Sequence, residues 1–273
     1  FFAKCFKLFL VYSFMKRMAF DLFGSIAVVK FPWKTKASEK KKFASRLMKE
    51  QKGVKTVIEK VGKFKGRLRK METRHIAGDK TKEVLYKENG CVFRFNIDNT
   101  YFSPRLSNER AEIAKKIKKG ESVLVMFAGV APYSIVIARN SKASRVVSNE
   151  INRKANKYAE LNLQLNKVRN KVELASGDIK KTVSKLKGQK FDVIVMPRPQ
   201  LKDSFLKQAF SLSKKGTRIY YYDFTKIEDI VSIVEKVKSE AKLARKKIKI
   251  LGTKHAGEIA PYKVRLRIDF KLI

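Results

Sequence analysis

A stretch that runs from an apolar strand through small residues into a helix, LVMFAGVAPYSI at residues 124–135, has the layout of a nucleotide-cofactor turn. Gly129 lets the backbone turn sharply and approach a ligand closely. Ala131 stands where the G-x-G motif of dinucleotide sites has its second glycine. The turn therefore favours a cofactor without a pyrophosphate, the group that a full G-x-G-x-x-G turn seats on a helix N-terminus. Its candidate cofactor-binding residues are Phe127, Ala128, Gly129, Val130 and Pro132.

Two acidic residues lie where the next two strands should end. Glu150 follows Gly129 by 21 residues, and a carboxylate there can accept hydrogen bonds from ribose hydroxyls. Asp178, in the sequence SGD, is expected near an adenine edge. The alternative is a structural turn with two solvated acids. These residues alone do not separate NAD from S-adenosylmethionine as the cofactor.

The elements that must position these residues alternate along the second half of the chain. Strands are predicted at 122–127, 145–149, 171–175, 192–196 and 217–222, and helices at 108–118, 133–139, 153–165, 203–213 and 226–244. Two last strands, 246–253 and 263–270, are joined by a short loop and predict an antiparallel edge. The pattern predicts an α/β fold with a doubly wound, mostly parallel sheet that binds its ligand at the carboxyl ends of the strands.

Residues 18–98 predict a smaller α+β domain in front of the larger domain at 99–273. Strand patterns cover 20–31, 69–75 and 83–86, and a Lys-rich helix covers 37–51. Residues 54–61 suit either a helix or an edge strand. Asn89-Gly90 predicts a tight hairpin turn before a returning strand at 91–97.

The composition points to a polyanionic partner. Lys and Arg total 64 against 25 Asp and Glu, which gives a net charge of +39. Nucleic acid is favoured over an anionic membrane or a solvated lysine coat, because the basic clusters follow the whole chain. They lie at 39–42, 63–70, Arg105, 115–119 and 242–249. Such clusters would contact phosphates without reading sequence.

Cysteine and histidine usage bounds the location and the chemistry. Two cysteines and two histidines, far apart, predict neither a disulfide framework nor a metal site, and favour a cytoplasmic protein. Residues 1–17 are apolar but too short and too interrupted by lysine to span a bilayer. They are either upstream of a true start at Met15 or Met18, or a short helix that touches a membrane or a partner. We expect a monomer without stable membrane association.

Two blocks of sequence carry a resemblance to a known family. YFSPRLSNER at 101–110 and MFAGVAPY at 126–133 resemble the archaeal and eukaryotic tRNA guanosine-37 N1-methyltransferases, including their wyosine-pathway relatives. The resemblance covers roughly 18–273. It implies a class I S-adenosylmethionine-dependent methyltransferase domain, a small RNA-contacting domain and tRNA as the partner. Family members usually carry a further N-terminal module without a counterpart here, as expected of a minimal variant or a truncated chain.

The resemblance also assigns roles by position. It implies that Glu109 is the general base for the guanine N1 proton, and that Arg69 stabilises the charge that develops on the guanine. Tyr101 would stack on a flipped-out base, Pro199 matches the proline of the family's Asn-Leu-Pro motif, and Arg105 would contact the substrate. The alternatives are a helix-start acid at Glu109, a phosphate contact or solvated side chain at Arg69, and a packed aromatic at Tyr101.

Two positions depart from the family pattern. Val125 replaces the acid that usually holds the methionine amino group of the cofactor. Pro197 replaces the Asn that touches the target base, so backbone carbonyls or Arg198 would have to supply that contact. The sequence therefore leaves open whether guanosine, a wyosine intermediate or both are methylated.

We predict a tRNA methyltransferase in which a purine nitrogen attacks the sulfonium methyl in line, with the protein supplying position and a base. One rival is a transferase of the aminocarboxypropyl group of the same cofactor. A second is an RNA-binding protein with a decayed cofactor site, which Val125, Ala131 and Pro197 would favour.

Overall fold

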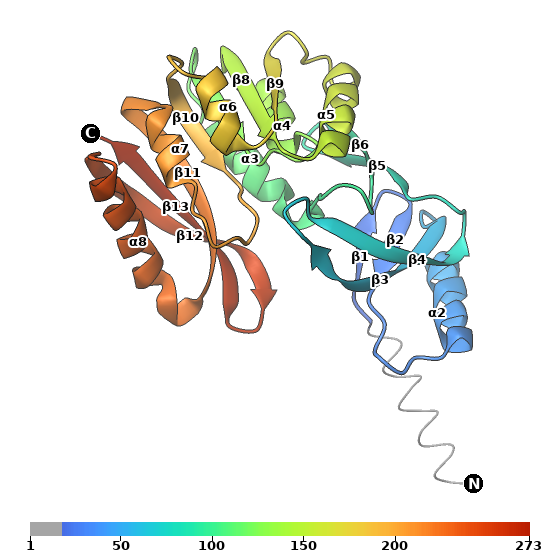
Figure 1. Cartoon of the computed structure of the whole chain (residues 1–273). Helices are drawn as coiled ribbons and strands as arrows, with labels where there is room; N and C mark the ends of the chain where they lie inside the picture. The colour runs from blue at the N-terminus through green and yellow to red at the C-terminus, as the bar shows by residue number, and fades with distance from the viewer. Residues whose placement is uncertain (1–17) are drawn as a thin grey trace.

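The computed structural model describes residues 18–273, apart from the side chains of residues 63–65. The prediction for residues 1–17 lies outside this range. Figure 1 shows two bodies side by side: a large sheet layered with helices, and a smaller sheet with one helix near the start of the chain. No helix within 18–273 is long and apolar enough to cross a membrane.

The large sheet has seven strands in the order β12-β13-β11-β10-β7-β8-β9. β13 is antiparallel to both of its neighbours, β11 and β12, while the other neighbouring strands pair in parallel. This confirms the predicted doubly wound fold of the class I methyltransferases, with one antiparallel C-terminal strand. The strands are β7 (Ser122–Met126), β8 (Arg145–Glu150), β9 (Val172–Ser176), β10 (Phe191–Met196), β11 (Ser213–Lys226), β12 (Ile248–Ala260) and β13 (Lys263–Leu272).

Helices cover both faces of this sheet because its strands are apolar on both sides. Along β7, Val123 and Val125 join the core beneath one set of helices, and Leu124 and Met126 join the core beneath the other. The first set is α3 (Ser107–Lys115), α4 (Pro132–Asn140) and α5 (Arg153–Leu165), and the second is α6 (Ile179–Lys185), α7 (Leu206–Ser211) and α8 (Ile230–Leu243). Short 3-10 helices precede α3 and α8, at η1 (Pro104–Leu106) and η2 (Ile227–Asp229). Within residues 18–273, each α-helix except α6 corresponds to a helix predicted from the sequence.

The smaller sheet has the order β1-β2-β3-β4. Its elements are β1 (Phe20–Phe23), β2 (Ile26–Val29), α2 (Ala37–Glu50), β3 (Thr56–Lys65) and β4 (Lys70–Gly78). β2 pairs with β3 in parallel, and α2 makes the crossover and buries Phe43 and Leu47 against the sheet. The ambiguous residues 54–61 therefore belong to a strand. Arg69, expected in a strand, lies in the turn between β3 and β4, where its φ is +54°.

The hairpin of β5 (Glu83–Glu88) and β6 (Cys91–Asn96) docks on α5 through two asparagines. The Asn162 amide accepts from the Arg94 N–H at 2.7 Å and donates to the Arg94 carbonyl at 3.1 Å. The Asn166 amide accepts from the Val92 N–H at 2.8 Å and donates to the Val92 carbonyl at 2.6 Å. Since the backbone of β6 is satisfied by α5, the hairpin belongs with the large unit. The hairpin thus contacts the larger sheet's helix, although the sequence analysis assigns it to the smaller domain at 18–98.

Candidate active site

The predicted cofactor turn forms one wall of a cavity at the carboxyl ends of β7, β8 and β10. The turn reverses through three residues with positive φ: Phe127 at +60°, Gly129 at +59° and Ala131 at +66°. A Cβ added to Gly129 would lie 3.3 Å from the Tyr101 carbonyl oxygen, so the glycine permits close approach of two backbones. Ala131 takes the same left-handed conformation without being a glycine, at a cost of about 1–2 kcal/mol.

Most of the candidate residues of this turn line the cavity. Phe127, Ala128, Gly129 and Pro132 do so, and Val130 does not. Val130 is fully buried in the core, and its carbonyl accepts a hydrogen bond from Asn162 at 3.1 Å. Val125 is also fully buried and outside the cavity lining, so its position does not hold the methionine end of a cofactor.

Glu150 lines the cavity and holds the turn in place. Its carboxylate accepts from the backbone N–H of Gly129 and from that of Asn152, both at 2.7 Å. Burial raises the pKa of Glu150, and the two backbone hydrogen bonds oppose that rise. Each carboxylate oxygen keeps a second lone pair, so Glu150 can still accept from hydroxyl groups in the cavity.

Asp178, predicted near an adenine edge, is not among the residues that line the cavity. Its carboxylate caps the N-terminus of α6 by accepting from the Lys180 N–H at 3.1 Å, and it pairs with Arg67 at 2.7 Å. The hydrogen bond from Arg67 holds the pKa of Asp178 below its usual value, although burial alone would raise it. Arg67 itself lines the cavity, so Asp178 anchors a wall residue.

Tyr101 and Arg69 lie together in the cavity wall. The Arg69 guanidinium lies over the Tyr101 ring, 4.9 Å from its centroid, and both residues line the cavity. Arg265 of β13 donates to the Tyr101 hydroxyl at 3.3 Å. A second cavity of about 770 Å³ lies between the smaller sheet and the β12–β13 hairpin, and it shares Tyr101 and Arg265 with the first. This volume suits a small-molecule-sized group.

Arg105 lines the second cavity rather than the first, and it pairs with Asp21 of β1 at 2.7 Å. This exposed ion pair joins the YFSPR loop to the smaller sheet. An exposed pair of this kind contributes little stability, so Arg105 can exchange Asp21 for a phosphate at little cost.

Arg198, predicted as a substrate contact, lines the cavity, and the protein itself engages its guanidinium. Its side chain is only 2% exposed and pairs with Asp223. It also donates to the Tyr221 hydroxyl at 3.1 Å and to the carbonyls of Pro199, Leu201 and Asp203 at 3.0–3.2 Å. These contacts shape the loop after β10 and place Pro197 and Pro199 in the cavity wall.

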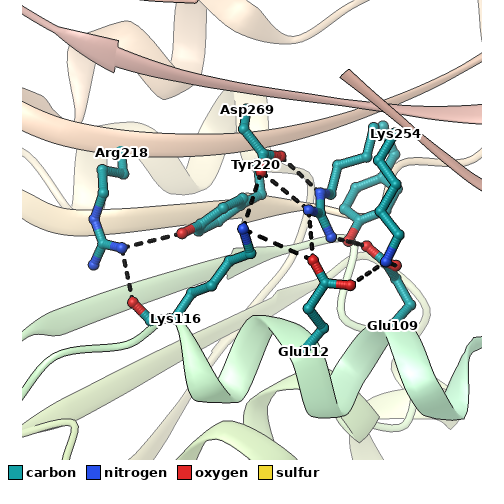
Figure 2. Close-up of polar contacts among 9 residues, drawn as sticks. Glu109, Glu112, Lys116, Arg218, Tyr220, Lys254 and Asp269 are labelled. Atoms are coloured by element: carbon teal, nitrogen blue, oxygen red, sulfur yellow. Dashed lines mark hydrogen bonds and ion pairs between the residues drawn. The ribbon is translucent and has the colours of Figure 1, made fainter. Parts of the chain in front are cut away.

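Glu109 is buried, with 5% exposure, yet it is not among the residues that line the cavity. Its carboxylate accepts from the Tyr222 hydroxyl at 2.7 Å, pairs with Arg267 and contacts Lys254 at 3.2 Å. Figure 2 shows Glu109 and Glu112 projecting from α3 toward Lys254 of the C-terminal hairpin. The predicted base therefore lies behind the cavity wall, and Tyr222 is the wall residue that contacts it.

Several lining residues escaped the sequence analysis. Tyr222 ends the strand predicted at 217–222, so the rule that ligands bind at strand ends would have found it. Asn152 lines the cavity beside Glu150 and caps α5. An asparagine before a helix is common for structural reasons alone, so its position in the sequence did not mark it as a site residue. Leu68 and Arg265 come from distant parts of the chain, and no local pattern marks them.

The sheet order, the single inserted antiparallel strand and the glycine turn backed by Glu150 define a class I methyltransferase. The TRM5/TYW2 methyltransferase domain matches residues 84–251, which begin in the hairpin docked on α5. The chain belongs to this family of methyltransferases.

The relatives named for their activity include two archaeal proteins. The tRNA (guanine(37)-N(1))-methyltransferase Trm5b of Pyrococcus abyssi is 35% identical over 93% of this chain and 74% of its own. The tRNA (guanine(37)-N(1))/4-demethylwyosine(37)-methyltransferase Taw22 of Nanoarchaeum equitans is 32% identical over 94% of this chain and 100% of its own.

Solved structures agree with the described fold. The crystal structure of Pyrococcus abyssi Trm5b matches 95% of this chain and 77% of its own with a TM-score of 0.84 and 33% identity. A complex of aTrm5 with tRNALeu matches 93% of this chain and 72% of its own, at a TM-score of 0.80 and 26% identity. Methanocaldococcus jannaschii Trm5 in complex with adenosine matches the same shares, at 0.76 and 25%.

Proposed function

We propose that the protein transfers the methyl group of S-adenosylmethionine to N1 of guanosine at position 37 of tRNA. The observation that carries the proposal is the shared wall between the two cavities. The cofactor turn at Gly129 and the pair Arg69–Tyr101 line one cavity, and Tyr101 also lines the larger one that opens toward the smaller sheet. A nucleotide that enters through the second cavity would pass Tyr101 and present its base to a cofactor in the first cavity, of which Tyr222 also forms a wall.

The first cavity fits an adenosine-containing cofactor. The Gly129 backbone leaves room at the turn, and Glu150 offers carboxylate lone pairs to ribose hydroxyls. Leu68 and Ile151 give the lining apolar surface that suits an adenine ring. When bound, S-adenosylmethionine supplies an electrophilic methyl group. Support also comes from the related structure that holds adenosine.

The second cavity fits a flipped-out nucleotide. Tyr101 offers a ring face for stacking, and Arg69 above that ring carries a fixed positive charge that can offset charge on the guanine O6. Arg69 reaches from the first cavity, while Lys30, Lys60 and Arg105 line the second and can bind a phosphate backbone. The net charge of +39 and the relative solved with tRNALeu support tRNA as the partner.

A second substrate, the 4-demethylwyosine intermediate at the same nucleotide, is favoured by one local observation. Pro197 stands where the family pattern usually has an Asn that touches the target base, and Arg198 fixes the surrounding loop. The Taw22 relative, which is named for both substrates, supports this extension. Proline side chains neither donate nor accept hydrogen bonds, so this wall constrains the hydrogen-bonding edge of the base less than an asparagine amide would.

The test is nucleoside mass spectrometry of tRNA with guanosine at position 37, after incubation with the protein and S-adenosylmethionine. The matched control is the same tRNA with adenosine at that position. N1-methylguanosine formed only in the first tRNA is the expected result. An unmodified guanosine tRNA, in the presence of measurable tRNA binding, would reject the proposal.

A further inference from the structure

Glu109 is connected to the cavity by a chain of buried hydroxyl groups. The Tyr222 hydroxyl donates to Glu109 at 2.7 Å, and the Tyr133 hydroxyl donates to that of Tyr222 at 3.4 Å. Both tyrosines are buried and line the first cavity, whereas Glu109 is absent from its lining. A proton that leaves a base in the cavity for Glu109 therefore meets Tyr222 first.

We infer that the Tyr222 hydroxyl relays the guanine N1 proton to Glu109, an inference that rests on the proposed function. The N1–H bond breaks and its electron pair forms the new N1–CH3 bond, while the sulfonium becomes a thioether. The N1 proton moves to the Tyr222 oxygen, and the proton of that hydroxyl moves to the Glu109 carboxylate. Tyrosine is neutral before and after the step, and Glu109 ends protonated.

The environment of Tyr222 suits a relay rather than a base. Burial raises the pKa of Tyr222 well above its usual value, and the neighbouring Tyr133 and Glu109 raise it further. A phenolate is therefore disfavoured, and the hydroxyl can only accept one proton while it gives up another. Its oxygen retains lone-pair capacity beyond the contact from Tyr133, so it can accept from a base in the cavity.

The surroundings of Glu109 suit the terminal acceptor. Arg267, with a side chain only 3% exposed, pairs with its carboxylate. Lys254 contacts the same carboxylate at 3.2 Å and is 42% exposed. The proton can therefore pass from Glu109 to solvent beside Lys254 after the methyl group has moved. Figure 2 shows Lys254 reaching Glu109 and Glu112 from the hairpin side.

The test is the single-turnover rate of methyl transfer to guanosine-37 tRNA by Tyr222→Phe, measured against pH. Removal of the hydroxyl should slow the transfer about 100-fold, the usual order for a lost proton-transfer group. The remaining rate should rise tenfold per pH unit, since hydroxide must then take the proton. Binding of tRNA and of S-adenosylhomocysteine should stay within twofold of the wild type.

Tyr220→Phe is the matched control. Tyr220 lies two residues earlier on β11, is equally buried, and accepts from Arg218 at 3.1 Å instead of contacting Glu109. Loss of the hydroxyl oxygen in Tyr220→Phe should change the single-turnover rate of methyl transfer by less than threefold. Glu109→Gln should be as slow as Tyr222→Phe, and the double variant no slower than either, because residues that act as a unit are not additive.

The outcomes separate the relay from the proposed function. A wild-type rate for Tyr222→Phe beside a slow Glu109→Gln would overturn the relay and make Glu109 a direct base. Additive losses in the double variant would also overturn it. Failure of the wild-type protein to form any N1-methylguanosine would instead overturn the proposed function, and the relay with it.

Discussion

Replacement of Gly129 by alanine tests whether the cofactor turn is built around a backbone that only glycine accommodates freely. Gly129 has a φ of +59°, where an L-residue costs about 1–2 kcal/mol. The lower entropy of the unfolded alanine chain returns about 0.4–1 kcal/mol. The net loss of unfolding free energy should be about 1 kcal/mol, a fall in melting temperature of about 2–4 °C.

The new methyl group would also act on the cavity. Its Cβ would lie 3.3 Å from the Tyr101 carbonyl, so the turn or the loop that contains Tyr101 must shift by a few tenths of an ångström. Both segments line the cavity, and we expect the affinity for S-adenosylhomocysteine to fall at least tenfold, about 1.4 kcal/mol.

Gly120→Ala separates strain from the effect on the cavity. Gly120 also has a positive φ, +83°, but no atom lies within 4 Å of an added Cβ, and the residue lies outside the cavity lining. It should lose a similar amount of stability and bind S-adenosylhomocysteine like the wild type. Calorimetric titration and thermal melting of the three proteins measure both quantities. Unchanged affinity in Gly129→Ala would refute the assignment of this turn to the cofactor.

Four further outcomes follow from the structure. Arg110→Met should lower the free energy of unfolding by about 3–5 kcal/mol, because it leaves the buried carboxylate of Glu88 without its partner at 2.5 Å. The double variant with Glu88→Leu should recover most of that loss. Chemical denaturation measures both, and an additive loss in the double variant would contradict the pairing. Ala131→Gly should raise the melting temperature slightly by relieving a φ of +66°. Burial would raise the pKa of Glu112, but hydrogen bonds from Lys254 and Arg267 hold it at about 2, against 4.5 unfolded. A lowered folded pKa means stability that is present above pH 4.5 and lost as pH falls toward 2, and Glu112→Gln should flatten that part of a melting-temperature profile, whereas an unchanged profile would count against the pairing. Burial raises the pKa of Cys91 to about 11, so iodoacetamide at pH 7.5 should label it, as read by peptide mass spectrometry, only after unfolding.

Local patterns were sufficient for most of the fold. The helix predicted at 153–165 has those bounds in the structure, because its apolar face repeats at helical spacing and Asn152 caps it. The helix α6 has seven residues, five of them Lys, Ser or Thr in a short KKTVSK run, and lacks a long apolar stripe. The docking of β6 on α5 depends on two asparagine amides, which no propensity reveals.

The site was predictable only where a strand end or a family motif marked it. Gly129 and Glu150 both lie at strand ends, and the Gly129 N–H donates directly to the Glu150 carboxylate. The same rule placed Asp178, whose carboxylate pairs with Arg67. Arg198 was instead expected to replace the base contact missing at Pro197, and its guanidinium pairs with Asp223. Partner choice of this kind depends on segments far apart in sequence, so it needs the folded chain.

The central claim is that a methyl group passes from S-adenosylmethionine to N1 of guanosine 37. The most direct measurement uses S-adenosylmethionine with a deuterated methyl group, followed by nuclease digestion and tandem mass spectrometry of the tRNA fragments. The account predicts a trideuteromethyl group on N1 of guanosine in the fragment that contains position 37, and in no other fragment. Label at another nucleotide, or an added aminocarboxypropyl mass, would contradict it.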